Sequence, residues 1–214
     1  MGQIQHIHLN RVEVKLKDTD DPLAAKISWE PANPGGTNFK AQKLIQTNQQ
    51  IVITKTIGAL LFALVFAIPG FVALLIGSPY FFISGELFLG FFMLVWGGMF
   101  GGVGFFVLHK GKKFTLDKAK GIYFRGKVFD DFGNDDRSQQ GYLKDIHAIQ
   151  LIAEHIRSSS SNGSSSNYMS YEMNLVLKDG ERVNIMDHGK GQDVDESAQR
   201  LGEFLAVPIW KAQF

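Results

Sequence analysis

Two uncharged stretches decide the fold of this chain. Residues 56–76 read TIGALLFALVFAIPGFVALLI, and residues 87–108 read LFLGFFMLVWGGMFGGVGFFVL. At a rise of about 1.5 Å per residue, each stretch would form a helix about 30 Å long, which matches the hydrocarbon thickness of a bilayer. Glu86 is the only charged side chain within this region, whereas the rest of the chain has the charge density of a soluble surface. The pattern predicts a transmembrane helical hairpin over residues 55–109 and excludes a wholly soluble protein.

The distribution of lysine predicts how this hairpin is oriented. Residues 36–55 contain three lysines and residues 109–128 contain a denser group of Lys and Arg, whereas the connecting turn, residues 77–86, contains neither. Because cationic residues gather on the cytoplasmic side, both termini are predicted to be cytoplasmic, in a multi-pass protein of the cell inner membrane. The first residues, Met1–Lys17, have no apolar core of signal-peptide length, so export of this segment is not expected.

Small residues recur at helical spacing on both predicted helices. They are Ala59, Ala63, Ala67, Gly97, Gly98, Gly101 and Gly102. Inside lipid no hydrophobic force drives helices together, and small residues favour association because they let two backbones approach closely. Two interpretations remain open: the stripes pack against each other within one chain, or the glycine face of the second helix receives a helix of a partner or of a second copy. Pro69 is expected to kink the first helix at mid-depth.

Residues 110–214 predict a small antiparallel β domain. Apolar residues alternate in Phe114–Phe124 around a Gly-containing turn, a long strand is expected over residues 143–156, and residues 168–186 form a second hairpin that turns at Asp-Gly. Residues 158–167, SSSSNGSSSN, are of low complexity and predict a mobile loop.

An amphipathic helix is expected near the end of this domain. Asp193 and Glu196 have capping-box spacing, the apolar residues that follow share one face, and Pro208 stops the helix. The fold class is therefore α+β: a two-helix transmembrane hairpin with a small open barrel or bent antiparallel sheet closed by the helix. Trp210 and Phe214 would either close the sheet or form a docking tail.

Residues 1–54 predict an N-terminal cytoplasmic arm with some strand character. Alternation over Val12–Leu16 and over Ala25–Trp29 indicates strands, and Phe39–Ile53 indicates a hairpin that turns near Thr47. These strands either complete the cytoplasmic sheet or form an extended arm on a partner.

Histidines and aspartates do not form a recognisable catalytic or metal-binding constellation. His6 and His8 share a face of an extended segment but lack a recognisable third ligand, and the other histidines singled out, His147, His155 and His188, are scattered. The aspartates of residues 130–136 miss the ligand order of an EF-hand, so a solvated acidic loop is favoured over a calcium loop.

Composition also excludes some classes of function. The chain has no cysteine, so no disulfide or thiolate chemistry is expected, and its net charge of +1 gives no case for nucleic acid as a partner. The prediction is a non-enzymatic protein with no cofactor and no metal.

A basic cluster follows the second helix. Lys110, Lys112 and Lys113 lie where lysines attract anionic lipid head groups at about 1 kcal/mol each. The same residues also fix topology by the positive-inside rule, and both interpretations stay open.

From residue 56 onward the chain resembles bacterial two-span membrane proteins with a cytoplasmic pleckstrin-homology-like domain, and its layout is similar to the photosystem I assembly protein family. The likeness rests on Phe114-x-Leu116-Asp117 with Gly121 and Arg125, on Leu143-Lys144-Asp145-Ile146-x-Ala148-Ile149, and on Ala198-x-x-Leu201-x-x-Phe204-Leu205-x-Val207-Pro208. It implies a membrane-anchored, non-catalytic binding module, without carrying over a photosynthetic partner.

These observations lead to one functional expectation and two alternatives. The expectation is an accessory subunit or assembly factor that contacts membrane lipid and binds a membrane-protein partner or a second copy. The alternatives are a module that senses anionic lipid and, less favoured, a membrane enzyme.

Overall fold

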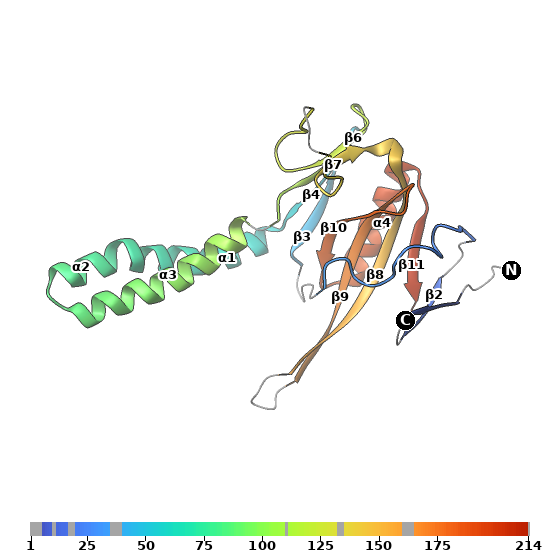
Figure 1. Cartoon of the computed structure of the whole chain (residues 1–214). Coiled ribbons are helices and arrows are strands. Elements are labelled where there is room, and N and C mark those ends of the chain that lie inside the picture. Colours follow the sequence, from blue (N-terminus) through green and yellow to red (C-terminus); the bar gives the residue numbers. More distant parts are fainter. Residues whose placement is uncertain are drawn as a thin grey trace. The chain divides into compact units, whose positions relative to one another are not determined.

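The structure is a computed structural model that describes residues 6–9, 12–16, 20–34, 40–109, 111–131, 135–159 and 165–213 (Figure 1). The chain is α+β and divides into two compact units. One unit, here called the helical unit, spans residues 55–112; the other, the sheet unit, combines residues 1–54 with residues 113–214.

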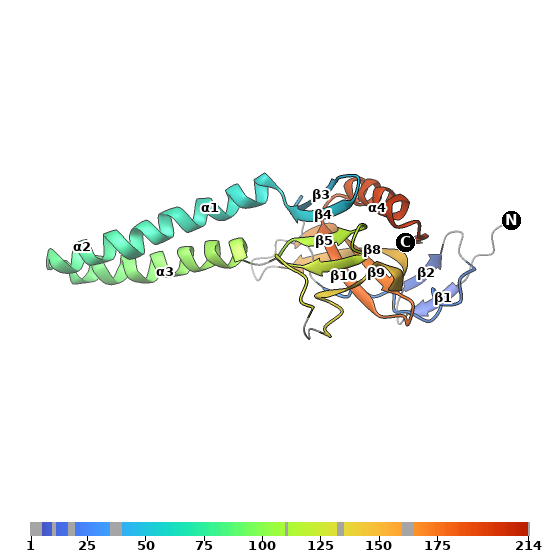
Figure 2. The same ribbon diagram turned by 90° about the horizontal axis from the view of Figure 1, so that it is seen from above.

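The helical unit is a hairpin of two apolar arms, which lie side by side in Figures 1 and 2. The first arm is continuous from Ile57 to Ile83 and the second from Leu87 to His109, and both are long and apolar enough to cross a membrane. The structure thus contains the two long apolar helices that the sequence predicts, although the first extends beyond its predicted end. The helical segments are α1 (Ile57–Val72), the π-helix η1 (Ala73–Gly77), α2 (Ser78–Ile83) and α3 (Leu87–His109).

The turn of this hairpin is shorter than the sequence predicts. The first helix was expected to end at residue 76 and the turn to occupy residues 77–86, but α2 continues the helix to Ile83. Pro79 is tolerated because it lies in the first turn of α2, where the π-helix η1 has already changed the hydrogen-bond pattern. The chain reverses at Gly85, whose φ of 81° favours glycine.

Polar groups complete the backbone hydrogen bonds at the open end of the hairpin. The Thr56 side chain caps α1 by accepting a hydrogen bond from the Ala59 N–H at 3.2 Å. Lys55 donates from Nζ to the carbonyls of Val107 and Leu108, at 2.8 and 2.5 Å. A cation at the last carbonyls of α3 also complements the negative end of the helix dipole.

The sheet unit contains two sheets. The five-stranded sheet is antiparallel with the order β3-β4-β5-β6-β7, and the six-stranded sheet has the order β1-β2-β11-β8-β9-β10, in which only the β11–β8 pair is parallel among the described strand pairs. The strands of the first sheet are β3 (Gln42–Gln46), β4 (Gln50–Lys55), β5 (Phe114–Asp117), β6 (Ile122–Arg125) and β7 (Gln140–Tyr142). Those of the second are β1 (His6–Leu9), β2 (Val12–Leu16), β8 (Ile146–Ser159), β9 (Ser165–Leu177), β10 (Arg182–His188) and β11 (Ile209–Gln213).

Strands from residues 1–54 lie in both sheets. β4 pairs with β5, so that Gln50 lies opposite Asp117, and β2 pairs with β11. Because β4 and β5 are neighbours in one sheet, the helical hairpin is an insertion between two adjacent strands. Both ends of the hairpin therefore connect to the same sheet.

One core joins the two sheets and α4 (Gly191–Leu205), which lies beside the strands in Figure 2. Ile51 and Phe114 come from the five-stranded sheet, Ile149 and Leu175 from the six-stranded sheet, and Leu201 from the helix. From residue 149 of β8 onward and along β9, odd-numbered residues face this core because side chains alternate along a strand, whereas before the register shift near the start of β8 it is Ile146 that faces it. The predicted hairpins and the amphipathic helix are confirmed by these elements.

Residues 20–34 cover the opposite face of β8 and β9. Trp29 and Ile27 pack there with Ile152 and Trp210, and the buried Glu172 carboxylate accepts hydrogen bonds at 2.9 Å from the main-chain N–H groups of residues 32 and 33. The strand predicted over Ala25–Trp29 is wrong: the segment forms turns, and its buried residues are spaced by three and then two.

Three further features differ from the sequence-based expectations. The paired strands β8 and β9 extend to Ser159 and from Ser165, so the predicted loop 158–167 is partly strand, and residues 160–164 lie outside the described residues. α4 begins at Gly191 without a side-chain cap, and Asp193 lies in its first turn. β11 follows α4 and buries Trp210, which therefore belongs to the sheet; Phe214 lies outside the described residues.

Candidate functional site

Small residues form the seam between α1 and α3. On α1 the buried residues are Ala59, Ala63, Ala67 and Gly70, and on α3 they are Gly90, Gly97, Gly101 and Gly104. Where the helices come closest, there is no room for a side chain on the glycine Cα. A Cβ on Gly97 would lie 2.6 Å from Leu74 N, and a Cβ on Gly104 would overlap the backbone of Ala67. The two helices therefore touch backbone to backbone, as small residues in a membrane allow.

The predicted small-residue set divides into two groups. Gly97 and Gly101 lie in the seam with the three alanines, whereas Gly98 and Gly102 are exposed and a Cβ on either would meet nothing within 4 Å. Since residues four apart share one face of a helix, Gly98 and Gly102 form a second glycine face, separate from the seam. We call this pair the outer glycine face.

Gly90 also belongs to the seam, although the sequence interpretation did not include it. A Cβ on Gly90 would lie 2.7 Å from the Phe82 ring. The sequence does contain a signal for Gly90: Gly90, Gly97 and Gly104 are spaced by seven residues. This spacing places them on one side of α3, the side that packs against the neighbouring helix.

The outer glycine face is bordered by large apolar side chains. These neighbours on α3 are all exposed: Phe91, Val95, Met99, Phe105 and Phe106. Because Gly98 and Gly102 carry no side chains, a second helix could approach the α3 backbone between these bulky neighbours.

The basic cluster after α3 is only partly described. Lys112 and Lys113 are exposed, and Lys110 lies outside the described residues. Their exposure suits a contact with head groups as well as a role in topology.

A second candidate region is a pocket of about 320 Å³ at β6 and β7. Its wall combines the aromatic rings of Tyr123, Phe129 and Tyr142 with the carboxylates of Asp131 and Asp135. Among the described residues, no group of three or more His, Asp or Glu is placed to hold a metal ion. The pocket includes part of the predicted acidic loop, of which residues 132–134 lie outside the described residues.

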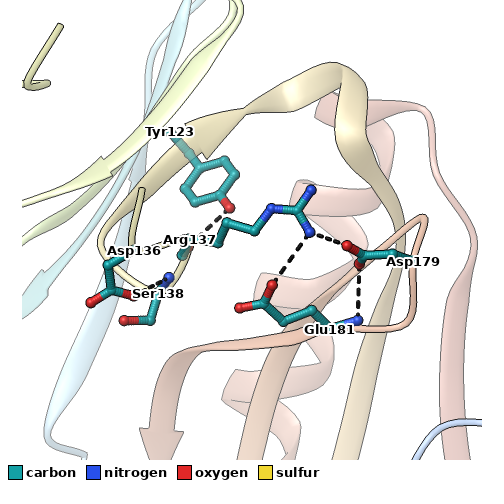
Figure 3. Close-up of polar contacts among 6 residues, drawn as sticks. All are labelled: Tyr123, Asp136, Arg137, Ser138, Asp179 and Glu181. Atoms are coloured by element: carbon teal, nitrogen blue, oxygen red, sulfur yellow. Dashed lines mark hydrogen bonds and ion pairs between the residues drawn. The ribbon is translucent and has the colours of Figure 1, made fainter. Parts of the chain in front are cut away.

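Arg137 lines this pocket, and its polar contacts are drawn in Figure 3. Its guanidinium forms ion pairs with Asp179 and, at 3.3 Å, with Glu181, while its main-chain carbonyl accepts a hydrogen bond from the Tyr123 hydroxyl at 3.0 Å. The Glu181 N–H and Arg137 together hold the pKa of Asp179 below its ordinary value. The cluster ties the β9–β10 turn to the segment before β7.

Histidines occupy unrelated places. His147 is 2.6 Å from Asp21 through Nε2, which fits the structural role predicted for it, and His155 is exposed. His188 is buried. His6 and His8 lie on β1, and their side chains are outside what the structure describes.

Comparison of the chain with protein-family models, with curated proteins and with solved structures gives no match.

Proposed function

We propose that the chain is a two-span integral membrane protein that acts without catalysis, as an accessory subunit or assembly factor. Its partner, a membrane protein or a second copy of the chain, binds at the outer glycine face of α3. The observation that carries the proposal is the division of the α3 glycines into a seam occupied by the first arm and a pair, Gly98 and Gly102, that no described residue of the helical unit contacts.

The two exposed glycines need a cause outside the hairpin. Glycine in a helix interior costs about 1 kcal/mol relative to alanine, and neither Gly98 nor Gly102 recovers this through a close approach within the chain. A partner helix supplies such an approach, because contact between backbones is the main attraction between helices in lipid.

Sheet pairing supports the proposed topology. Because β4 and β5 are hydrogen-bonded neighbours, the residues before and after the hairpin lie on one side of any membrane that it spans. The lysines on both flanks make that side cytoplasmic. The resemblance to pleckstrin-homology-like membrane proteins implies the same layout: two spans connected to a sheet against which α4 packs.

The test is association of the full chain after extraction in mild detergent. Gly98→Leu with Gly102→Leu fills the outer glycine face without a clash inside the chain, since a Cβ at either position meets nothing within 4 Å. Phe92→Leu with Val103→Leu is the matched control, because both residues are exposed on the same helix and neither borders the outer glycine face. Gly104→Leu, which overlaps Ala67, reports the loss of the hairpin itself.

We expect the wild type and the Phe92/Val103 control to migrate as a complex, with a partner protein or as a dimer. The Gly98/Gly102 variant should migrate as a folded monomer, and its helical circular dichroism should stay unchanged. A wild type that is monomeric after extraction from its native membrane contradicts the proposal. So does a Gly98/Gly102 variant that associates as the wild type does.

A second candidate function, recognition of anionic lipid, is favoured by the exposure of Lys112 and Lys113. Replacing Lys110, Lys112 and Lys113 by Gln should lower the amount of phosphatidylglycerol that stays bound to the purified full chain, as measured by mass spectrometry. The control replaces three other exposed lysines, Lys26, Lys120 and Lys178, by Gln. Equal lipid retention in the two triple variants contradicts this function.

A further inference from the structure

A small pocket lies in the sheet unit between β3, the end of β10 and the first turns of α4, three elements that lie close together in Figure 1. Its volume is about 200 Å³. The Gln42 side chain fixes one wall, because its Oε1 accepts a hydrogen bond from the Asp187 N–H at 3.0 Å and so ties β3 to β10. None of the functions considered above uses this pocket.

His188 lines the pocket with a buried donor that has no acceptor. Its side chain is 1% exposed, and Nδ1 accepts a hydrogen bond from the Lys190 N–H at 2.9 Å. Nδ1 is therefore the unprotonated nitrogen and Nε2 carries the proton. Nε2 has no hydrogen-bond partner among the residues that the structure describes, and the Asp193 carboxylate, at 3.8 Å, is too distant to be one.

Burial keeps this imidazole neutral. Desolvation is the largest influence on His188 and lowers its pKa, and the nearby Asp193 opposes that effect only in part. The side chain therefore presents a single N–H group to the pocket at neutral pH. A buried N–H without an acceptor is unfavourable, and an acceptor that enters the pocket removes that penalty.

Charge around the pocket selects the kind of acceptor. Lys40, Lys43 and Arg200 line it and outnumber the two carboxylates, Asp193 and Glu196. Asp193 is already paired with Lys40 at 3.1 Å, which holds its pKa below the ordinary value, and Glu196 accepts from Gln192 at 3.3 Å. α4 starts at Gly191 without a side-chain cap and its first turn contributes Asp193 to the lining, so the positive end of the helix dipole lies near the pocket.

We propose that this pocket binds a phosphate-type oxyanion, with His188 Nε2 as a hydrogen-bond donor and Lys43 and Arg200 as the main cations. A phosphoryl oxygen accepts a hydrogen bond from the unpaired Nε2–H group. Lys43 and Arg200, which do not take part in the Asp193–Lys40 ion pair, balance the negative charge of the phosphate. The phosphate belongs to a soluble phosphate ester or to a lipid head group. The site is separate from the outer glycine face, so its failure leaves the proposed function standing.

The experiment measures binding to the full chain in dodecyl maltoside micelles, which contain no phosphate. Inorganic phosphate and a short-chain phosphatidic acid are titrated separately by calorimetry. His188→Asn keeps an acceptor for the Lys190 N–H and deletes the Nε2 donor, whereas Lys43→Gln with Arg200→Gln deletes the charge. Lys120→Gln with Lys178→Gln is the control of equal charge, at exposed positions outside the pocket.

We expect His188→Asn and the Lys43/Arg200 variant each to weaken binding about tenfold or more, because hydrogen bonds to charged groups are among the stronger ones. The control should bind as the wild type does. Binding of inorganic phosphate assigns the site to soluble phosphate esters, and binding of phosphatidic acid alone assigns it to a lipid head group. The proposal is overturned if neither probe binds, or if His188→Asn and the Lys43/Arg200 variant bind as well as the wild type.

Discussion

Tyr123 is expected to keep its proton far above the pH at which exposed tyrosines lose theirs. Its side chain is almost fully buried, and desolvation raises its pKa to about 12. Arg137 acts in the opposite direction, and the carboxylates of Glu181, Asp145 and Asp179 add to the rise. The hydroxyl is also held as a donor to the Arg137 carbonyl at 3.0 Å, which requires the protonated form.

The magnitude follows from proton linkage. A raised pKa means that the folded chain keeps the proton in a range where the unfolded chain has lost it. The resulting stabilisation is complete below pH 10 and is lost as the pH rises to about 12. Two pKa units correspond to about 3 kcal/mol of unfolding free energy. Tyr123→Phe has no such dependence, although at pH 8 it is less stable than the wild type by about 1 kcal/mol, because the hydrogen bond to residue 137 is gone.

The assay is urea unfolding of the full chain in detergent, followed by circular dichroism between pH 8 and pH 12. The rise of tyrosinate absorbance with pH shows how many tyrosines lose their proton only well above pH 10. Between these limits the wild type should lose about 2 kcal/mol more stability than Tyr123→Phe, because at pH 12 the folded-state hydroxyl is only half ionised. Tyr142→Phe, at an exposed ring, should follow the wild type. The reasoning is refuted if the stability difference between wild type and Tyr123→Phe is the same at both limits, or if every tyrosine titrates together near pH 10.

Three other predictions concern the sheet unit and are measured by urea unfolding of the full chain. Trp29→Ala should cost about 3–5 kcal/mol, because the ring is 2% exposed and fills the second core; a loss below 1 kcal/mol would mean that residues 20–34 do not pack there. Gly180→Ala should cost about 1–2 kcal/mol through backbone strain at a φ of 91°, whereas Ala32→Gly, at an exposed position, serves as a mild control. The pKa of His188 is depressed, so the unfolded chain binds the extra proton first and stability should fall as the pH drops below about 6.5; His188→Asn should remove this part of the slope, and an unchanged slope would show that His188 titrates normally.

The sequence predicts the hairpin and most strands because each depends on local information. The uncharged stretches, the period-two alternation around Phe114 and Leu116, and the Asp-Gly turn before β10 are all visible in single segments. Pairing between distant segments has no local signal. The Ala25–Trp29 alternation was misinterpreted because a segment of turns can also bury apolar residues at mixed spacing when it lies across a sheet.

The candidate sites show the same limit. That small residues bring α1 and α3 together follows from composition, but the rotation of α3 about its own axis decides that Gly97 is in the seam and Gly98 is not. The seven-residue repeat of Gly90, Gly97 and Gly104 contains that information. The His188 pocket was not predictable, since Lys43 and Arg200 meet only after β3 and α4 are packed in one unit.

The position of β11 has a consequence for how the chain folds during synthesis. β11 lies between β2 and β8, so the first hairpin, β1–β2, is joined to the larger sheet through the described strand that leaves the ribosome last. Until then, the edge of β2 that will pair with β11 has only water or other proteins as hydrogen-bond partners. The hairpin over residues 55–109 is synthesised during this interval, between β2 and β11. The N-terminal strands thus keep an unpaired edge, open to chaperones, from the synthesis of β2 until the synthesis of β11.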